Sequence, residues 1–477
     1  MTTLGSLENP LRVAIIGSGP SGFYAAESLQ KQEKEGLYVE IDMFDRLPTP
    51  FGLVRGGVAP DHPKIKSVTK VYDRIATQPN FRFFGHVEFG TDITRADLEA
   101  HYHAVIYATG AQTDRNLNIP GEDLSGSHAA TEFVAWYNGH PDFRDAKFDL
   151  TQESAVIVGV GNVAMDVTRI LARSDAELRE TDIADYALDA LVNSNIKRIY
   201  VLGRRGAAQA AFTNPEIKEL GEMEDADILV GPSEVEIDAL SQAYLDSPEV
   251  NRVDLKNVDI LKEYASRTPE GKPKQIIMRF LTSPVEVIGT DHVEAVKVVR
   301  NELYKTDKGE LRPQATGDFE TIPAGLIFRS VGYRGVALPD VPFYDAWGII
   351  PNDHGRVLTQ MKDGEPVYGH YVVGWIKRGP SGIIGTNKPD SVETVQMLLD
   401  DQTNDKLLKP SAPSRDAVEK LLKERGVNYV TFADWQILDQ LEVDNGTAQG
   451  RPRVKFTSVQ SMLDAIEAHR TPNPGGD

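Results

Sequence analysis

A glycine-rich turn between an apolar strand and a helix occurs twice in this chain, and this repetition limits the possible folds more than any other feature. The first copy, Gly17-Ser-Gly-Pro-Ser-Gly22, follows the predicted strand Leu11–Ile16 and opens a predicted helix, Ser21–Gln30. In such a turn the first glycine makes the bend, the second lets the backbone approach a pyrophosphate, and the third lets the helix pack on the strand. The pattern predicts a dinucleotide-binding βαβ unit; a tight turn without a ligand is the alternative.

An acidic residue closes the second strand of this unit. Asp45 follows the predicted strand Val39–Phe44, at a position where a carboxylate can bind the hydroxyls of an adenosine ribose. It lies 28 residues beyond Gly17, somewhat farther than usual, and the helix extension Lys31–Leu37 accounts for the excess. The first unit is therefore expected to bind a dinucleotide through its unphosphorylated ribose.

The second copy, Gly159-Val-Gly-Asn-Val-Ala164, has the opposite charge at the equivalent place. It follows the predicted strand Ala155–Val158, and the next strand, Arg198–Leu202, leads to Arg204 and Arg205. Two guanidinium groups suit a 2′-phosphate, which they can bind bidentately, and do not suit a ribose diol. This unit is expected to prefer NADP(H) to NAD(H); a solvated arginine pair is the alternative. One unit for ribose and one for phosphate indicate FAD followed by NADPH.

A third glycine-rich block, Gly374–Asn387, lies far beyond both turns. Glycines at this density permit close approach of the backbone to a flat ring. A polar-capped helix, Ser391–Leu399, is predicted to follow, and its N-terminal amides can stabilise negative charge on a reduced flavin. The apolar strand ending in Ala-Thr-Gly at Val105–Gly110 also favours a flavoprotein with two dinucleotides. For the block taken alone, a glycine-rich surface loop is the alternative.

We predict an α/β protein with two Rossmann-like dinucleotide-binding domains, one for FAD and one for NADP, in which the FAD domain is discontinuous in sequence. Residues 1–112 form its first part, residues 113–332 form the NADP-binding domain, and residues 333–477 form its second part with a C-terminal helical extension. The last residues, Thr471–Asp477, are predicted to be disordered.

Three local predictions concern regions outside the glycine turns. Lys64–Arg74 is predicted to be a helix, and Asp175–Asn193 a long polar helical insertion. The alternating apolar stretches Ile276–Leu281, Val285–Ile288 and Val293–Asn301 predict a small antiparallel sheet.

Composition excludes several kinds of chemistry. The chain contains no cysteine, which removes disulfides, catalytic thiols and cysteine-ligated iron–sulfur clusters, so redox chemistry requires a bound cofactor. A formal net charge of −20 argues against nonspecific binding to nucleic acid or anionic membranes. We find neither an apolar run of about 18 residues nor a signal peptide, and we expect a cytoplasmic protein without an integral membrane segment.

With these motifs in view, the chain closely resembles the adrenodoxin reductase family of NADPH–ferredoxin reductases, and within it the actinobacterial ferredoxin/NADPH reductases. The resemblance runs nearly end to end. Its family-specific segments are Pro48–Arg55, Gly57–Lys66, Leu117–Glu122, Gly203–Gly206, Arg329–Tyr333 and Gly374–Asn387.

The resemblance, together with the glycine turns, implies which residues bind the cofactors. Those expected at FAD are Gly17, Gly19, Pro20, Ser21, Gly22, Asp45, Leu53, Val87, Trp375, Gly382, Ile383 and Ile384. Those expected at NADP are Arg115, Gly159, Val160, Gly161, Asn162, Val163, Arg204, Arg205, Glu216 and Gly382. His62 and Asp166 are catalytic candidates by family position, although structural roles are the alternative. Two residues depart from the family. Asp45 replaces the usual Glu, which is expected to weaken the ribose contact without changing the cofactor, and Phe51 fills a position that is often Trp, with little expected consequence.

The activity implied is that of a ferredoxin–NADP⁺ reductase, an FAD flavoprotein that takes hydride from NADPH and passes single electrons to a ferredoxin-type iron–sulfur protein. One alternative is an NADPH oxidase or diaphorase that uses quinones or dyes. Another, from a different class, is a non-catalytic NADP/FAD-binding sensor. The Gly374–Asn387 block argues against a sensor, because a sensor needs no reactive flavin face.

A basic face is expected to dock the acceptor despite the acidic whole. Lys66, Lys70 and Arg74 fall at i, i+4 and i+8 of one predicted helix and would share one side. Small ferredoxins are commonly acidic, so opposite local fields would steer the encounter. A solvated helix face is the alternative. Further cations that could extend the surface are Lys64, Lys377 and Arg378.

Overall fold

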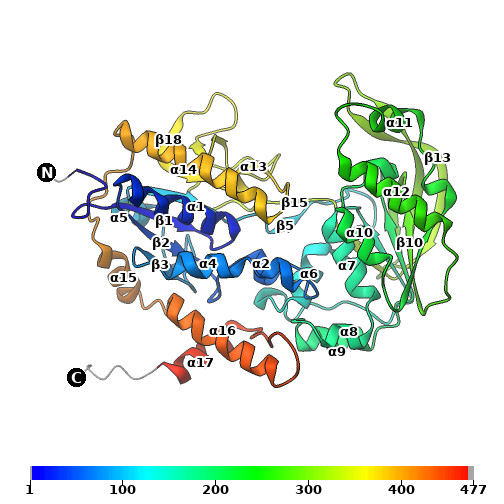
Figure 1. The fold of residues 1–477 in the computed structure, drawn as a ribbon, viewed down its shortest axis with the longest axis horizontal. Coiled ribbons are helices and arrows are strands. Elements are labelled where there is room, and N and C mark those ends of the chain that lie inside the picture. The colour runs from blue at the N-terminus through cyan, green and yellow to red at the C-terminus, as the bar shows by residue number, and fades with distance from the viewer. Residues whose placement is uncertain (1–2, 471–477) are drawn as a thin grey trace.

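Each glycine turn follows a parallel strand of a separate sheet, and the two sheets form the cores of two lobes that lie side by side (Figure 1). The computed structural model describes residues 3–470, and the predicted disorder of Thr471–Asp477 lies outside this range. The two-sheet α/β architecture agrees with the prediction from the repeated turn.

The first lobe is built on a seven-stranded sheet with the strand order β16-β17-β18-β4-β1-β2-β3. The central strand β1 is buried along its whole length and runs parallel to β2 and β4, as expected where helices cover both faces of a sheet. Its strands are β1 (Leu11–Ile16), β2 (Val39–Phe44), β3 (Phe81–Phe84), β4 (Ala104–Tyr107), β16 (Asn352–Asp353), β17 (Arg356–Leu358) and β18 (Pro366–Val372).

Strands from both ends of the chain therefore complete one sheet. β18, from beyond the second lobe, pairs in parallel with β4. Helix α14 packs against α1, which places the third glycine block near the first glycine turn (Figure 1). The helices of this lobe are α1 (Pro20–Gln30), α2 (Leu53–Gly56), α3 (Pro63–Lys66), α4 (Thr69–Ala76), α5 (Arg95–His101), α13 (Trp375–Arg378) and α14 (Asn387–Thr403).

The two chain crossings between the lobes run side by side. Strand β5 (Thr113–Asp114) leaves the first lobe, and β15 (Tyr333–Arg334) returns to it. These short strands pair with each other in antiparallel register, Tyr333 opposite Asp114. Both covalent connections thus pass through one two-stranded ribbon.

The second lobe is built on a six-stranded sheet with the order β6-β14-β7-β8-β10-β9. Its strands are β6 (Ser127–Ala129), β7 (Ser154–Val158), β8 (Arg198–Leu202), β9 (Ala226–Val230), β10 (Lys274–Arg279) and β14 (Leu326–Arg329). Its helices are α6 (Ala130–Tyr137), α7 (Asn162–Ala172), α8 (Asp175–Arg179), α9 (Asp185–Val192), α10 (Asn214–Leu220), α11 (Ala239–Leu245) and α12 (Arg252–Ser266).

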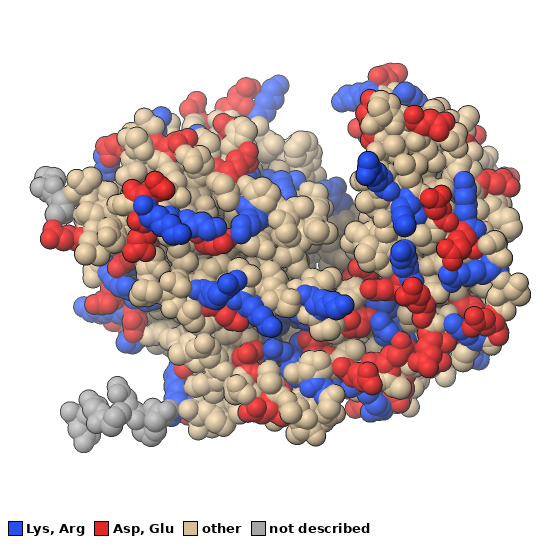
Figure 2. Space-filling model, in the orientation of Figure 1, with Lys and Arg blue, Asp and Glu red and all other residues tan. Residues whose placement is uncertain are grey.

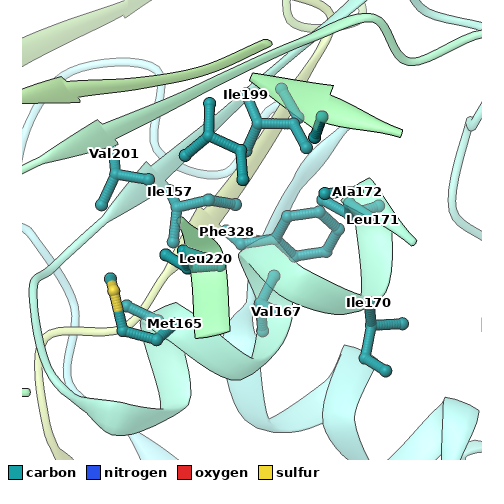
Figure 3. Packing of buried hydrophobic residues seen from close by; sticks show 14 of the residues in the cluster. Ile157, Met165, Val167, Ile170, Leu171, Ala172, Ile199, Val201, Leu220 and Phe328 are labelled. Carbon is teal, nitrogen blue, oxygen red and sulfur yellow. The ribbon is translucent and has the colours of Figure 1, made fainter. Parts of the chain in front are cut away.

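A large apolar cluster holds α7 against this sheet. Met165 and Leu171 of α7 share the cluster with Ile157 of β7, Val201 of β8 and Phe328 of β14 (Figure 3). All five side chains are essentially fully buried, and burial of one such side chain contributes about 1.5–3 kcal/mol. This packing fixes the start of α7, and with it the second glycine turn, relative to the strand ends.

The structure corrects the predicted antiparallel sheet. β10 runs parallel to β8 and β9 inside the six-stranded sheet. The alternation of apolar residues that led to the prediction reflects a strand that is buried on one face and only partly buried on the other. The antiparallel sheet consists instead of β11 (Thr282–Ile288), β12 (Ala295–Lys305) and β13 (Leu311–Pro323).

Two predicted helices are interrupted. The segment Lys64–Arg74 divides into α3 and α4 at Ser67 and Val68, so its basic residues do not share one straight face. The insertion Asp175–Asn193 divides into α8 and α9. Ser174 begins α8 with a capping box, and the chain leaves the helix again five residues later.

The C-terminal extension is helical, as predicted, and lies along the first lobe and beneath the junction of the lobes (Figure 1). It comprises α15 (Arg415–Glu424), α16 (Phe432–Thr447) and α17 (Val459–His469). Among the described residues, no helix is both long enough and apolar enough to cross a membrane.

Candidate functional site

The first glycine turn has the shape of a pyrophosphate cradle. Gly17 has φ of 104°, and an added Cβ would lie 2.6 Å from the Ala108 carbonyl oxygen. At Gly22 an added Cβ would overlap the Gly17 carbonyl. At Gly19, which caps α1, an added Cβ would meet nothing within 4 Å. The turn is closed toward the protein and open at the helix N-terminus, where an anion is favoured, so the residues fit a dinucleotide.

Asp45 is fixed beside this cradle by short-range hydrogen bonds. Its Oδ2 accepts from the Ser18 N–H at 2.9 Å and from Ser18 Oγ at 2.5 Å. Its Oδ1 accepts from the Leu47 N–H at 3.0 Å. The carboxylate is therefore held at the end of β2. Val87, another expected FAD residue, is buried, and its N–H donates to the Asp45 carbonyl at 2.9 Å.

The third glycine block reaches the first turn across the whole length of the chain. Gly374 has φ of 77°, and an added Cβ would lie 2.5 Å from Ser21 Oγ. Its N–H donates to Asp390 Oδ2 at 2.6 Å, and Ser391 Oγ donates to the Ser21 carbonyl at 2.9 Å. Residues predicted separately as an FAD turn and a flavin-facing block thus form one structure. Asp390, which sets the turn at Gly374, was not predicted.

Apolar side chains beside this block are left uncovered. Ile383 is 60% exposed and Leu53 is 45% exposed. Trp375 stacks on Tyr333 with ring centroids 5.4 Å apart, and its Nε1 donates to the Ser381 carbonyl at 3.1 Å. Exposed apolar side chains beside an open glycine turn suit a flat aromatic ring.

The second glycine turn repeats the geometry of the first. Gly159 has φ of 134°, and an added Cβ would overlap the Ser330 carbonyl. Gly161, which caps α7, is open in the same way as Gly19. Asn162 Oδ1 accepts from the Thr213 N–H at 2.8 Å, which joins the turn to α10. This turn also fits a pyrophosphate.

The two arginines after β8 lack acidic partners. Arg204 is exposed and Arg205 is half-buried, and no carboxylate of the described chain lies within 4.0 Å of either guanidinium. Burial, with the neighbouring Arg204 charge, lowers the pKa of Arg205. Two positive charges without a directly paired carboxylate, beside a glycine turn, suit an anion. Arg115, also expected at NADP, is exposed beside Gly332 near the ribbon between the lobes.

A buried guanidinium joins the lobes between the two cradles. Arg169, on α7, is fully buried, and its Nε lies 2.5 Å from Oδ2 of Asp61, which belongs to the first lobe. The same guanidinium contacts Asp166 Oδ1 at 2.6 Å and Glu216 Oε2 at 2.8 Å. The predicted site residues Asp166 and Glu216 therefore both contact Arg169, which was not predicted as a site residue.

His62 completes this group from the first lobe. Its Nδ1 lies 3.9 Å from Asp166 Oδ1 and 4.0 Å from Glu216 Oε1, and its Nε2 lies 2.8 Å from Glu219 Oε2. His62, Glu216 and Glu219 are close enough to share a cation, and the guanidinium of Arg169 already supplies one. The junction cluster, as we name it, consists of Asp61, His62, Asp166, Arg169, Arg173, Glu216 and Glu219.

The junction cluster has more acids than fixed cations. Its four carboxyl groups surround two guanidinium groups. Burial raises the pKa of Asp166 to about 7 and also raises that of Glu216. Burial would lower the pKa of His62, but the hydrogen bond to Glu219 and nearby carboxylates raise it. The cluster therefore retains a proton near neutral pH.

The structure removes two residues from the predicted docking surface. Lys66 Nζ lies 2.6 Å from Oδ1 of the buried Asp182, so this lysine links the lobes and does not face solvent freely. Lys377 is 6% exposed and lies 2.6 Å from Glu393 Oε2. In contrast, Lys64, Lys70 and Arg74 are exposed, and basic side chains gather over α4 in Figure 2.

The fold and the two cradles define a class of protein, the oxidoreductases that bind two dinucleotides. Residues 11–208 match a family model described as pyridine nucleotide-disulphide oxidoreductase. The chain is also 47% identical over 455 residues to NADPH-ferredoxin reductase FprA of Mycobacterium leprae, covering 94% of this chain and 97% of that protein. It therefore belongs to the NADPH–ferredoxin reductase family, as the sequence motifs predicted.

Two further relatives extend this comparison. The mitochondrial NADPH:adrenodoxin oxidoreductase of Arabidopsis thaliana is 38% identical over 469 residues, which cover 96% of this chain and 95% of that protein. The solved structure of Mycobacterium tuberculosis FprA in complex with NADPH matches with a TM-score of 0.89 and 45% identity, covering 96% of this chain and 100% of that one. Both lobes are thus included in the match.

Proposed function

We propose that this protein is an NADPH-dependent FAD flavoenzyme that delivers single electrons to a ferredoxin-type iron–sulfur protein. The observation that carries the proposal is the opposite charge of two otherwise similar cradles, with Asp45 at one and Arg204 and Arg205 at the other. FAD, when bound, supplies chemistry that no side chain of a cysteine-free chain can supply, because it accepts two electrons together and releases them singly.

We assign the lobes accordingly. Residues 1–112 and 333–477 would bind FAD, and residues 113–332 would bind NADPH. The FAD residues are Gly17, Gly19, Pro20, Ser21, Gly22, Asp45, Leu53, Val87, Trp375, Gly382, Ile383 and Ile384. The NADPH residues are Arg115, Gly159, Val160, Gly161, Asn162, Val163, Arg204, Arg205, Glu216 and Gly382. Support comes from the contact between the third glycine block and the first turn.

His62 and Asp166 are proposed to manage charge where the lobes meet. Both belong to the junction cluster, which retains a proton near neutral pH because its acids outnumber its guanidinium groups. Glu219 holds the imidazole of His62 by a hydrogen bond at 2.8 Å. These side chains would orient the two cofactor sites toward each other and hold a proton at the His62 ring or the Asp166 carboxyl.

Docking of the acceptor is proposed on the exposed cations Lys64, Lys70 and Arg74. They remain after Lys66 is assigned to its ion pair with Asp182. Opposite charge on an acidic iron–sulfur protein would accelerate encounter, and salt would screen this effect. Reversal of Lys70 and Arg74 to Glu should then slow ferredoxin reduction. Lys420→Glu is the matched control, because Lys420 is 77% exposed on the distant helix α15.

The test of the proposed function compares acceptors. Purified protein should be yellow, NADPH should bleach it, and cytochrome reduction should depend strongly on added ferredoxin. Ferredoxin-dependent turnover should fall with rising salt, while reduction of a neutral dye should not. Equal turnover with quinones or dyes in the absence of ferredoxin would support a diaphorase instead, and protein that binds both nucleotides without bleaching would support a sensor.

A further inference from the structure

The loop that carries Arg204 and Arg205 is fastened by a distant part of the chain. The Thr282 N–H donates to the Gly203 carbonyl at 2.9 Å. Leu281, whose φ of 47° lies in the left-handed region, donates its N–H to the Arg205 carbonyl at 2.9 Å. Both donors lie where β10 passes into β11, at the root of the antiparallel sheet. The direction of the arginine loop therefore depends on this insertion.

Asn301 of β12 binds the loop carbonyl that lies between those of Gly203 and Arg205. Its side-chain Nδ2 donates to the Arg204 carbonyl at 2.9 Å and to Ser283 Oγ at 2.8 Å, and its backbone N–H donates to the Leu281 carbonyl at 2.7 Å. Asn301 is 5% exposed. Because a carbonyl oxygen can only accept, the NH₂ group of the amide must face Arg204. Three consecutive loop carbonyls, from Gly203 to Arg205, are thus all bound by this root.

The position of Asn301 in its strand is irregular. The register of β12 against β13 shifts between Val299 and Asn301, and both of these residues are buried. Such irregularities re-aim a side chain at the cost of ladder hydrogen bonds. Here the re-aimed side chain is the amide that reaches the arginine loop.

Two arginines near this loop are paired with an acid, unlike Arg204 and Arg205. Arg279 Nε lies 3.5 Å from Glu234 Oε1, and Arg300 Nη1 lies 3.1 Å from the same oxygen. Arg204 and Arg205, by contrast, have no carboxylate within 4.0 Å in the described part of the chain. Of these four arginines, the two on the loop held by Asn301 keep their positive charges available for an anion.

We propose that Asn301 is a positioning residue for cofactor choice, which fixes the Arg204 backbone so that both guanidinium groups face the 2′-phosphate of NADPH. This inference rests on the NADPH site proposed above and adds a specificity determinant to it. Asn301 acts through the loop, since both protons of its amide are used within the protein. NADH, which lacks the phosphate, should not sense the loss of this contact.

The test is Asn301→Leu, which keeps the volume and removes the donor. With a small dye as acceptor, the KM for NADPH should rise about tenfold, as expected for one lost buried hydrogen bond, while kcat and all NADH parameters stay within about twofold. Inhibition by 2′,5′-ADP should weaken by the same factor, and inhibition by 5′-ADP should not. Ser283→Ala is the matched control, because it removes the other partner of the amide and leaves the Arg204 contact.

A double-mutant cycle separates this inference from the proposed site. In the Arg204→Ala, Arg205→Ala background, Asn301→Leu should have no further effect, because it acts through the arginines. If the arginine pair itself does not affect the choice between NADPH and NADH, the proposed NADPH site is wrong. If the pair matters and Asn301→Leu does not, or if it weakens both cofactors equally, the positioning role is wrong. If Asn301→Leu fails to fold or to retain FAD, the same measurements are made on Asn301→Asp, which keeps the shape of the side chain and also removes the NH₂ donor.

Discussion

The two glycine turns share a backbone and differ in how their specificity is built. Gly17 and Gly159 both have positive φ, and each would drive a Cβ into the carbonyl at the end of a facing strand. Asp45, beside the first turn, is held by residues within the same βαβ unit. Arg204, beside the second, is held by Asn301, almost a hundred residues away. In the proposed assignment, the acid for the ribose needs only local support, whereas the unpaired arginines for the phosphate are held by a distant strand.

The largest effect is expected from removing the two arginines that are proposed to bind the 2′-phosphate. The double variant Arg204→Ala, Arg205→Ala should lower kcat/KM for NADPH by about 10²–10⁴-fold, since each charged hydrogen bond contributes about 1.5–3 kcal/mol. Steady-state kinetics with NADH should change little. Equal losses with both cofactors would mean that the arginines support the loop and do not distinguish the phosphate.

A smaller effect should follow when a Cβ is added in either glycine turn. Each of the two substitutions should impair the binding of a different cofactor. Gly17→Ala and Gly159→Ala each place a Cβ against a carbonyl at positive φ, at a cost of about 2–4 kcal/mol. Gly17→Ala should yield protein with little bound FAD, measured by its visible absorption. Gly159→Ala should stay yellow and lose reduction by NADPH. A colourless Gly159→Ala protein would contradict the assignment of the two lobes.

Removal of Asp45, the acid beside the first turn, should have a weaker effect than removal of the two arginines beside the second turn. Asp45→Ala should weaken FAD binding about 10–100-fold, the range expected for loss of a charged hydrogen-bond acceptor, with no change in the KM for NADPH. Asp45→Glu should hold FAD at least as tightly as the natural chain, since the family usually has Glu here. Flavin release at dilution measures both. Unchanged FAD retention in Asp45→Ala would show that the carboxylate only accepts hydrogen bonds from Ser18 and Leu47 and does not bind FAD.

The smallest effect is a pH dependence at the junction cluster, between the two turns. Burial raises the pKa of Asp166 to about 7 from an ordinary 3.8, so between about pH 4 and 7 the folded state binds a proton that the unfolded state has lost. Stability should therefore fall as pH rises through this window, by up to about 1.4 kcal/mol per pH unit. Urea unfolding at several pH values should show a flatter profile for Asp166→Asn.

Asp182 provides the matched control for this pH profile. Lysine neighbours lower its pKa to about 2, despite a burial penalty, so its contribution is present above pH 4 and is lost as pH falls toward 2. Asp182→Asn should lower stability at neutral pH without changing the slope between pH 4 and 7. A slope that is unaffected by Asp166→Asn would place the retained proton on another member of the cluster.

The sequence predicted the parts of the fold that depend on local patterns. β1, β2 and β8 begin and end where apolar runs predicted, because each run is bounded by a turn and most of its residues are buried. The alternation in β10 predicted a strand correctly but its partners wrongly, since period-two burial does not reveal whether a neighbouring strand is parallel. Strand pairing is a long-range property that no single segment contains.

The same limit applies to charges. Lys66 had the spacing of a solvent-facing residue, and its partner Asp182 lies more than a hundred residues away on the other lobe. Arg169 follows Asp166 by three residues within α7, and this spacing was the one available sign of a buried ion pair. Asn301 had no sign at all, because its role depends on a register shift between two strands.

The ribbon formed by β5 and β15 makes the second lobe a domain inserted at one point of the first. The chain enters this lobe at Asp114 and leaves it at Tyr333, and these residues face each other as an antiparallel pair. An inserted domain whose ends already lie side by side can be exchanged between reductases without stretching the host sheet. If this lobe binds NADPH as proposed, cofactor preference should be transferable as one continuous gene segment that carries both the arginine loop and the strand that holds it, provided that the ion pairs between the lobes, such as Asp61–Arg169 and Lys66–Asp182, are matched.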